Sequence, residues 1–153
     1  CDDPEAMDAK NTMLLASFYA GVAITASGTT AVHALSYPLG GKYHIAHGVS
    51  NAILLAPVMR FNEPACRPLL AKAYDRCLKG DAKTEEEKSA AVIQRLEGIV
   101  KHLDIPTSLT EFGVPKEDLE ALVASGMEVT RLLVNNMRTV TADDARKIYQ
   151  EVL

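Results

Sequence analysis

The chain has 153 residues and a mass of 16.5 kDa, enough for one domain that buries about 70% of its unfolded surface. Hydrophobic residues make up 48% and charged residues 24%, which excludes a disordered or fibrous protein. The net charge of −4 argues against nucleic acid or an anionic membrane surface as the main partner, because both bind concentrated positive charge.

Three cysteines, Cys1, Cys66 and Cys77, form neither a disulfide framework nor a CxxC metal pair. We therefore expect a reducing, cytoplasmic compartment. No signal peptide is visible, and the chain begins with Cys1 instead of Met. We expect it to be a piece of a longer protein.

The first predicted helix runs from Ala6 to Ala26 and is apolar on nearly every side. A helix of this kind must be surrounded by other helices. Its apolar run, residues 13–26, is shorter than the roughly 20 residues that a membrane span requires. The pattern therefore predicts a buried core helix and no membrane segment.

A shorter helical segment, residues 30–35, is predicted to end in a turn at Pro38-Leu39-Gly40-Gly41. The next apolar run, residues 49–61, again indicates burial on all sides, and Pro57 predicts a kink or an early end. Pro64 and Pro68 then mark the border between a buried inner layer and an amphipathic outer layer.

Beyond this border the periodicity is that of amphipathic helices. One is predicted over residues 69–78, with Gly80 as its stop, and another over 85–103, opened by a capping box of Thr84 and Glu87. The remaining signals are a second, shorter box at Ser108 to Glu111, a helix start at Pro115, and a last helix opened by Thr141 with Asp144. Strand signals are nearly absent, so we predict a single all-α domain over residues 1–153, with two central apolar helices.

Three of the four histidines, His33, His44 and His47, fall within fifteen residues of the least charged region. A neutral imidazole in apolar surroundings costs free energy unless its nitrogens are paired. A single such histidine is more often a core residue, but three around one turn indicate metal binding. His33 precedes the turn and His47 opens the next helix, so both rings can converge. His44 with His47 is a rival pair.

Two histidines do not complete a catalytic metal site, which usually has three protein ligands. Imidazole nitrogen suits zinc and ferrous iron equally. No Asp or Glu lies between Asn11 and Met59. Either one of four N-terminal acids completes the site (Asp2, Asp3, Glu5 or Asp8), or the other ligands lie outside this chain. His102, at the polar end of a solvent-facing helix, is interpreted as a surface cation.

Residues 31–53 read AVHALSYPLGGKYHIAHGVSNAI, and they closely resemble the second signature of the iron-containing (group III) alcohol dehydrogenases. Residues 54–62 and 11–17 are similar to that family as well. The resemblance is specific over residues 11–62 and compatible through the helical remainder. It would cover the whole chain but only the back part of a family member.

The resemblance implies a helical bundle like the C-terminal domain of the dehydroquinate synthase-like and iron-containing alcohol dehydrogenase fold. In that family an N-terminal α/β domain binds the nucleotide, and a metal is held by an aspartate and three histidines. The last two histidines match His33 and His47. The Asp-x-x-x-His motif and the glycine-rich cofactor loop should precede Cys1, so the N-terminal domain is expected to be missing here.

The implied function is that of a metal-dependent alcohol dehydrogenase, which transfers hydride between an alcohol and NAD or NADP to give an aldehyde or ketone. The implied metal is Fe²⁺, with Zn²⁺ as an alternative. We expect a homo-oligomer acting on a small alcohol or carbonyl substrate, and we expect this chain alone to be inactive.

Two residues depart from the family pattern. Tyr37 stands where many members carry a further histidine near the nicotinamide, so its catalytic role would be that of a hydrogen-bond donor on that side of the pocket. Ala46 replaces a frequent proline before the second ligand.

A non-enzymatic alternative is also kept: a helical oligomerisation or scaffold module whose histidines belong to its core.

Overall fold

The computed structural model describes residues 3–153, and every regular element among them is helical. The long helices are α1 (Met7–Ser27), α2 (Ala31–Tyr43), α3 (His47–Cys77) and α4 (Glu85–His102). Two short 3₁₀ turns follow, η1 (Leu109–Phe112) and η2 (Lys116–Asp118). The chain ends with α5 (Leu119–Met127), α6 (Thr130–Leu133) and α7 (Ala142–Gln150). The all-α prediction is confirmed.

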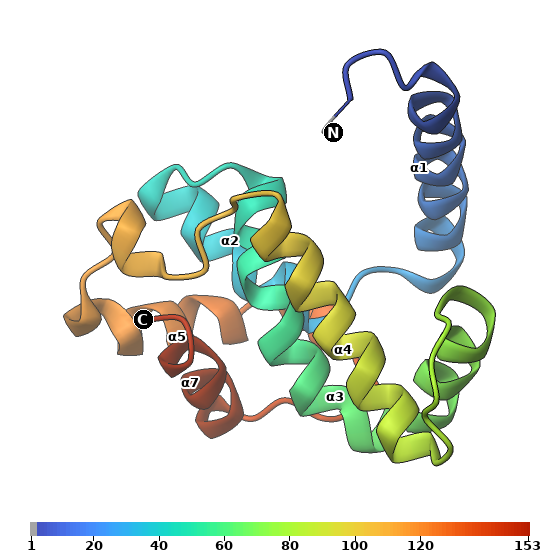
Figure 1. The fold of residues 1–153 in the computed structure, drawn as a ribbon. Helices are drawn as coiled ribbons and strands as arrows, with labels where there is room; N and C mark the ends of the chain where they lie inside the picture. The colour runs from blue at the N-terminus through green and yellow to red at the C-terminus, as the bar shows by residue number, and fades with distance from the viewer. Residues whose placement is uncertain (1–2) are drawn as a thin grey trace.

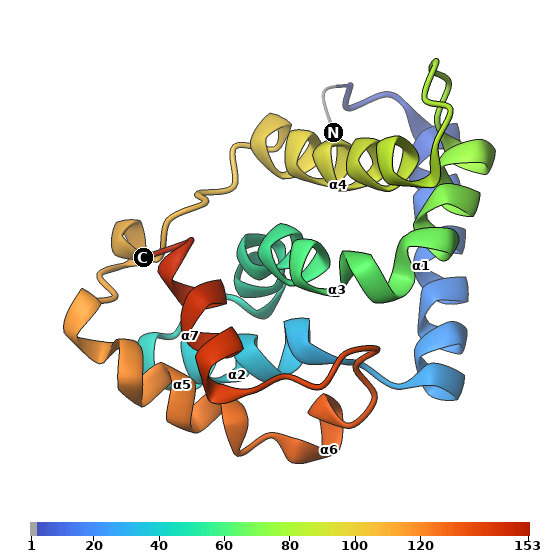
Figure 2. The ribbon, with the colours of Figure 1, turned by 90° about the horizontal axis from the view of Figure 1, so that it is seen from below.

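The helices other than α1 form three layers, with α3 in the middle (Figure 2). One side of α3 packs against α4, and the other against α2, with α5 and α7 beyond. The main core joins α2, α3, α5 and α7 through fully buried side chains such as Leu35, Leu54, Leu122 and Tyr149. This core fixes the position of α2 relative to α3.

Close packing of α2 on α5 depends on Gly126. A Cβ atom at this position would lie 2.8 Å from Cδ2 of Leu35 and 3.1 Å from the Tyr149 hydroxyl, so a larger residue would push the helices apart. The Tyr149 hydroxyl donates a 2.6 Å hydrogen bond to the carbonyl oxygen of Leu35. Two independent contacts therefore hold α2 at its middle.

The prediction that the first helix is buried is wrong for this chain. The bounds of α1 agree with the prediction to within one residue, but none of its residues is buried. Leu14 is 74% exposed and Phe18 is 65% exposed. Figure 1 shows α1 standing beside the bundle, joined to it by residues 28–30. The other helices close a core without it, so no described element covers its apolar surface.

Prolines do not end the helices where the sequence predicts. α2 continues through Pro38 to Tyr43, and α3 continues for 31 residues through Pro57, Pro64 and Pro68. A proline inside a helix costs about 3 kcal/mol, and burial of the surrounding apolar face offsets that cost. The helix changes direction along its length instead of stopping (Figure 1). The predicted border at Pro64 and the separate helix after it are therefore absent.

The predicted capping boxes have two different outcomes. Thr84 with Glu87 and Thr141 with Asp144 form complete boxes at the starts of α4 and α7. Ser108 accepts a hydrogen bond from the Thr110 amide, but it opens only the 3₁₀ turn η1.

No single helix in residues 3–153 is long and apolar enough to cross a membrane; α1 and α2 pass that test only as a pair bent by 106°.

Candidate metal site

The corner between α2 and α3 brings His33 and His47 together. The chain reverses at His44, whose φ of 57° places it in the left-handed region, and α3 then begins at His47. The turn thus begins three residues after the predicted turn at residues 38–41, which lies inside α2. The ring centres of His33 and His47 are 5.2 Å apart, with 58° between the ring planes. The two imidazole rings therefore lie side by side, as the sequence predicted.

This separation fits two ligands of one metal ion. With metal–nitrogen distances of about 2.1 Å and a tetrahedral angle, two imidazole centres on one ion lie about 5 Å apart. Two imidazole nitrogens suit Fe²⁺ as well as Zn²⁺. The pair therefore has the spacing and the chemistry of half a coordination shell.

The electrostatics of the corner favour uncharged imidazole. His33 is half-buried, and its pKa is lowered first by this burial and then by the neighbouring His47. A lower pKa leaves the ring neutral at neutral pH, and only the neutral ring offers a nitrogen lone pair to a metal.

Tyr37 lies one helical turn after His33 and belongs to the same cluster. Its ring centre is 6.0 Å from that of His47, and its side chain is partly exposed. The guanidinium carbon of Arg131, on α6, lies 5.9 Å from the centre of the tyrosine ring. The structure therefore places all three predicted site residues side by side.

Asn51 is a member of the cluster that sequence reasoning missed. It follows His47 by one turn of α3, and its Nδ2 lies 3.0 Å from Nε2 of His47. Its Oδ1 atom is buried and accepts no hydrogen bond from the described residues. The sequence offered one signal for it: Asn51 lies four residues after the candidate ligand His47, a spacing that places two side chains side by side on a helix. The unpaired oxygen leaves an acceptor at the site for a further group.

A cavity of about 520 Å³ adjoins the cluster. Its walls come from the end of α1, residues 28–30, α2 and the first three turns of α3, and most are apolar. The lining residues are Ile24, Gly28, Thr29, Thr30, Val32, His33, Gly48, Asn51, Ala52, Leu55 and Met59. A space of this size can hold a small molecule or a side chain next to His33.

The described part of the chain does not complete the metal site. No group of three or more His, Cys, Asp or Glu side chains within residues 3–153 is placed to hold an ion. Asp3, Glu5 and Asp8 are exposed at the outer end of α1, so they do not supply the missing acid, and Asp2 lies outside the described residues, as does Cys1. The rival pair is not formed, because His44 is exposed and no ring contact or hydrogen bond joins it to His47 in that range. His102 is exposed in the last turn of α4, as predicted.

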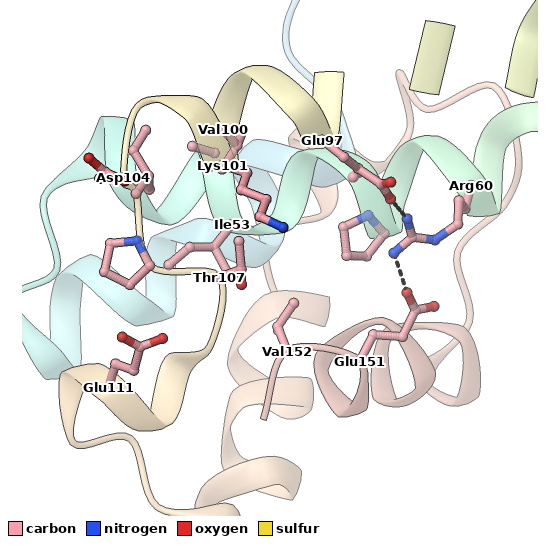
Figure 3. A pocket seen from close by; sticks show the side chains of 15 residues that line it. Ile53, Arg60, Glu97, Val100, Lys101, Asp104, Thr107, Glu111, Glu151 and Val152 are labelled. Carbon is pink, nitrogen blue, oxygen red and sulfur yellow. Dashed lines mark hydrogen bonds and ion pairs between the residues drawn. The ribbon is translucent and has the colours of Figure 1, made fainter. Parts of the chain in front are cut away.

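A second cavity, of about 600 Å³, lies among α3, α4, the loop at residues 104–107 and the chain end after α7 (Figure 3). Arg60 is held there by ion pairs with Glu97 and, at 2.6 Å, with Glu151. None of the predicted site residues borders this cavity. The Arg60 guanidinium is already paired with two carboxylates. This second cavity therefore contributes nothing to the candidate metal site.

Comparison with known proteins gives the context of this geometry. Long-chain-alcohol dehydrogenase 1 of Geobacillus thermodenitrificans is 38% identical over 144 residues, which are 93% of this chain and 36% of that protein. 4-Hydroxybutyrate dehydrogenase of Clostridium kluyveri is 31% identical over 140 residues, which are 91% of this chain and 37% of that protein. The chain thus spans little more than a third of the length of these relatives.

A solved structure of an alcohol dehydrogenase shares the fold of this chain. The crystal structure of the archaeal halo-thermophilic Red Sea brine pool alcohol dehydrogenase is 27% identical and superposes with a TM-score of 0.84, covering 99% of this chain and 40% of that one. The family model described as "Fe-containing alcohol dehydrogenase family, C-terminal" matches residues 1–153. The chain therefore belongs to the iron-containing alcohol dehydrogenase family, as its C-terminal helical domain.

Proposed function

We propose that His33 and His47 are two metal ligands of a metal-dependent alcohol dehydrogenase, of which this chain forms the C-terminal part. The observation that carries the proposal is the 5.2 Å separation of the two rings at the α2–α3 corner. The remaining ligands and the nucleotide-binding domain would come from the preceding part of the enzyme, since the chain spans about a third of its relatives. The metal proposed is Fe²⁺, with Zn²⁺ as the alternative.

The overall reaction is hydride transfer between an alcohol and NAD or NADP. When bound, the divalent ion supplies Lewis-acid polarisation of the substrate oxygen. His33 and His47 would hold the ion, and the adjoining cavity, whose walls are mostly apolar, would border it on the His33 side. Tyr37, next to His47, is the proposed hydrogen-bond donor on the nicotinamide side. Cytoplasmic location and homo-oligomeric assembly stay predictions.

The test replaces each histidine in the complete enzyme. We expect His33→Ala and His47→Ala each to weaken binding of Fe²⁺ or Zn²⁺ by more than about 100-fold, beyond the loss that follows removal of a supporting hydrogen bond. Elemental analysis and calorimetric titration measure the metal, and alcohol oxidation is followed through NADH. His44→Ala is the matched control, because His44 is in the same corner but apart from the pair. Unchanged metal content in both variants contradicts the proposal.

One observation favours the alternative of an oligomerisation or scaffold module. The exposed apolar surface of α1 is typical of a helix that packs against another protein segment. The same experiment separates the two functions. A scaffold whose histidines only fill the core loses stability in the His33→Ala variant, and it binds no stoichiometric metal before or after the substitution.

A further inference from the structure

Arg131 is a cation at the edge of the His33, Tyr37 and His47 cluster. Its guanidinium carbon lies 5.9 Å from the centre of the Tyr37 ring, and that ring centre lies 6.0 Å from His47. An arginine over an aromatic face is attracted to the ring and restricted in its orientation. The Tyr37 ring therefore neighbours both a proposed metal ligand, His47, and the positive charge of Arg131.

The backbone that carries Arg131 is anchored on both sides. Leu132 is buried in the protein, and Nδ2 of Asn135 donates to the carbonyl oxygen of Thr29, 3.2 Å away, just before α2. Gly28 permits this close approach, because a Cβ atom there would lie 2.6 Å from the Asn135 amide nitrogen. The position of α6 beside α2 is therefore set by packing.

The exposed side chain of Arg131 keeps its guanidinium N–H groups available as hydrogen-bond donors. Within residues 3–153 it takes part in no hydrogen bond or ion pair, whereas Arg60, Arg67 and Arg146 each bind carboxylates. No acidic residue lies between Asn11 and Met59, the segment that contributes the α2–α3 corner. An anion at Arg131 would thus meet no carboxylate from α2 or from residues 47–59 of α3.

We propose that Arg131 binds a carboxylate group of the substrate, so that the enzyme prefers hydroxy acids to uncharged alcohols. This proposal rests on the proposed function, which places the substrate hydroxyl at His33 and His47. A guanidinium offers a carboxylate two parallel hydrogen bonds with charge assistance. The substrate would then extend along the Tyr37 ring, with its hydroxyl at the histidine pair and its carboxylate at Arg131.

The experiment compares substrates of equal length in the complete, metal-loaded enzyme. The pairs are 4-hydroxybutanoate with 1-butanol and 5-hydroxypentanoate with 1-pentanol, and the readout is the ratio of kcat/KM for acid over alcohol. A charge-assisted hydrogen bond stabilises by about 1.5–3 kcal/mol, so we expect Arg131→Gln to lower this ratio by about 10- to 100-fold. Arg131→Lys keeps the positive charge but loses the two parallel N–H donors, so we expect an intermediate ratio of kcat/KM for acid over alcohol.

Binding without turnover gives an independent readout. Calorimetry with butanoate should show a dissociation constant at least about tenfold higher in Arg131→Gln than in the unsubstituted enzyme. Arg95→Gln is the matched control, because Arg95 is an exposed arginine on α4, away from the α2–α3 corner, and its substitution should leave the ratio and the butanoate affinity unchanged.

Each other outcome overturns the proposal. An unchanged ratio shows that the guanidinium does not bind the substrate. A raised KM for NAD(H) with an unchanged ratio assigns Arg131 to a phosphate of the cofactor. Oxidation of uncharged alcohols without any preference for acids removes this proposal while the proposed function stands. Lack of bound metal and of any alcohol oxidation in the unsubstituted enzyme removes both.

Discussion

The hydroxyl of Tyr149 holds α2 close to the α2–α3 corner that carries His33 and His47. It donates to the carbonyl oxygen of Leu35, two residues from His33, and burial raises the pKa of the phenol. Both side chains are fully buried. One hydrogen bond from α7 thus helps to fix the position of α2 in the bundle, and with it the position of His33, the proposed ligand.

We expect Tyr149→Phe to lower the free energy of unfolding by about 1 kcal/mol, because it removes one buried hydrogen bond and leaves the packing volume almost unchanged. Urea unfolding followed by circular dichroism measures the change. Tyr19→Phe is the control, since Tyr19 is 62% exposed on α1. Equal midpoints for Tyr149→Phe and the unsubstituted chain would show that the bond adds no stability.

Among the elements, α2 is also held at its C-terminal end. Nζ of Lys42 and the hydroxyl of Tyr43 both donate to Oδ2 of Asp118, in the 3₁₀ turn before α5. Hydrogen bonds from Lys42 and then Tyr43 hold the pKa of Asp118 below its ordinary value of 3.8. The same contact holds the pKa of Lys42 above 10.5.

These shifts predict how the contact depends on pH. Because the pKa of Asp118 is lower in the folded protein than in the unfolded chain, its stabilising contribution is complete above 3.8 and is lost as the pH falls through the folded value. Urea midpoints of the unsubstituted chain and Asp118→Asn should therefore differ at pH 6 and converge below pH 3.8. A difference that stays constant down to pH 2 would contradict this assignment.

The elements show which features could be predicted from sequence. Local chemistry was sufficient for the boxes at Thr84 and Thr141 and for a chain reversal between His33 and His47. It was insufficient at Pro38 and Pro64, because the cost of a proline competes with the burial of a whole helix face. Asn51 was missed since its role depends on the orientation of His47, which only the fold defines.

At the scale of the whole molecule, α1 and the bundle are separate in their packing. The main core contains side chains from α2, α3, α5 and α7 and none from α1. The all-round apolar pattern of α1 led to the wrong prediction of burial, because a sequence pattern does not show whether the covering surface belongs to the same chain. In residues 3–153 that surface is absent.

Removing residues 1–28 should leave a folded bundle. We expect the melting temperature of the shortened chain to stay within about 4 °C, the shift that about 1 kcal/mol causes in a domain of this size. We also expect weaker self-association in sedimentation velocity, because eight large apolar side chains of α1 are lost. Leu14→Ser with Phe18→Ser in the intact chain is the companion variant. A shortened chain without a cooperative transition would show that α1 contributes to the core.

The tight corner at His44 has a consequence for the order of assembly. His33 and His47 are only fourteen positions apart, so a single short loop closure brings them together, at low entropic cost and on the timescale of a local event. The two imidazoles can be aligned as soon as α2 and α3 meet, before any distant segment docks. If the pair binds a metal ion as proposed, the ion would meet two of its ligands already aligned, and its other ligands would be added around them.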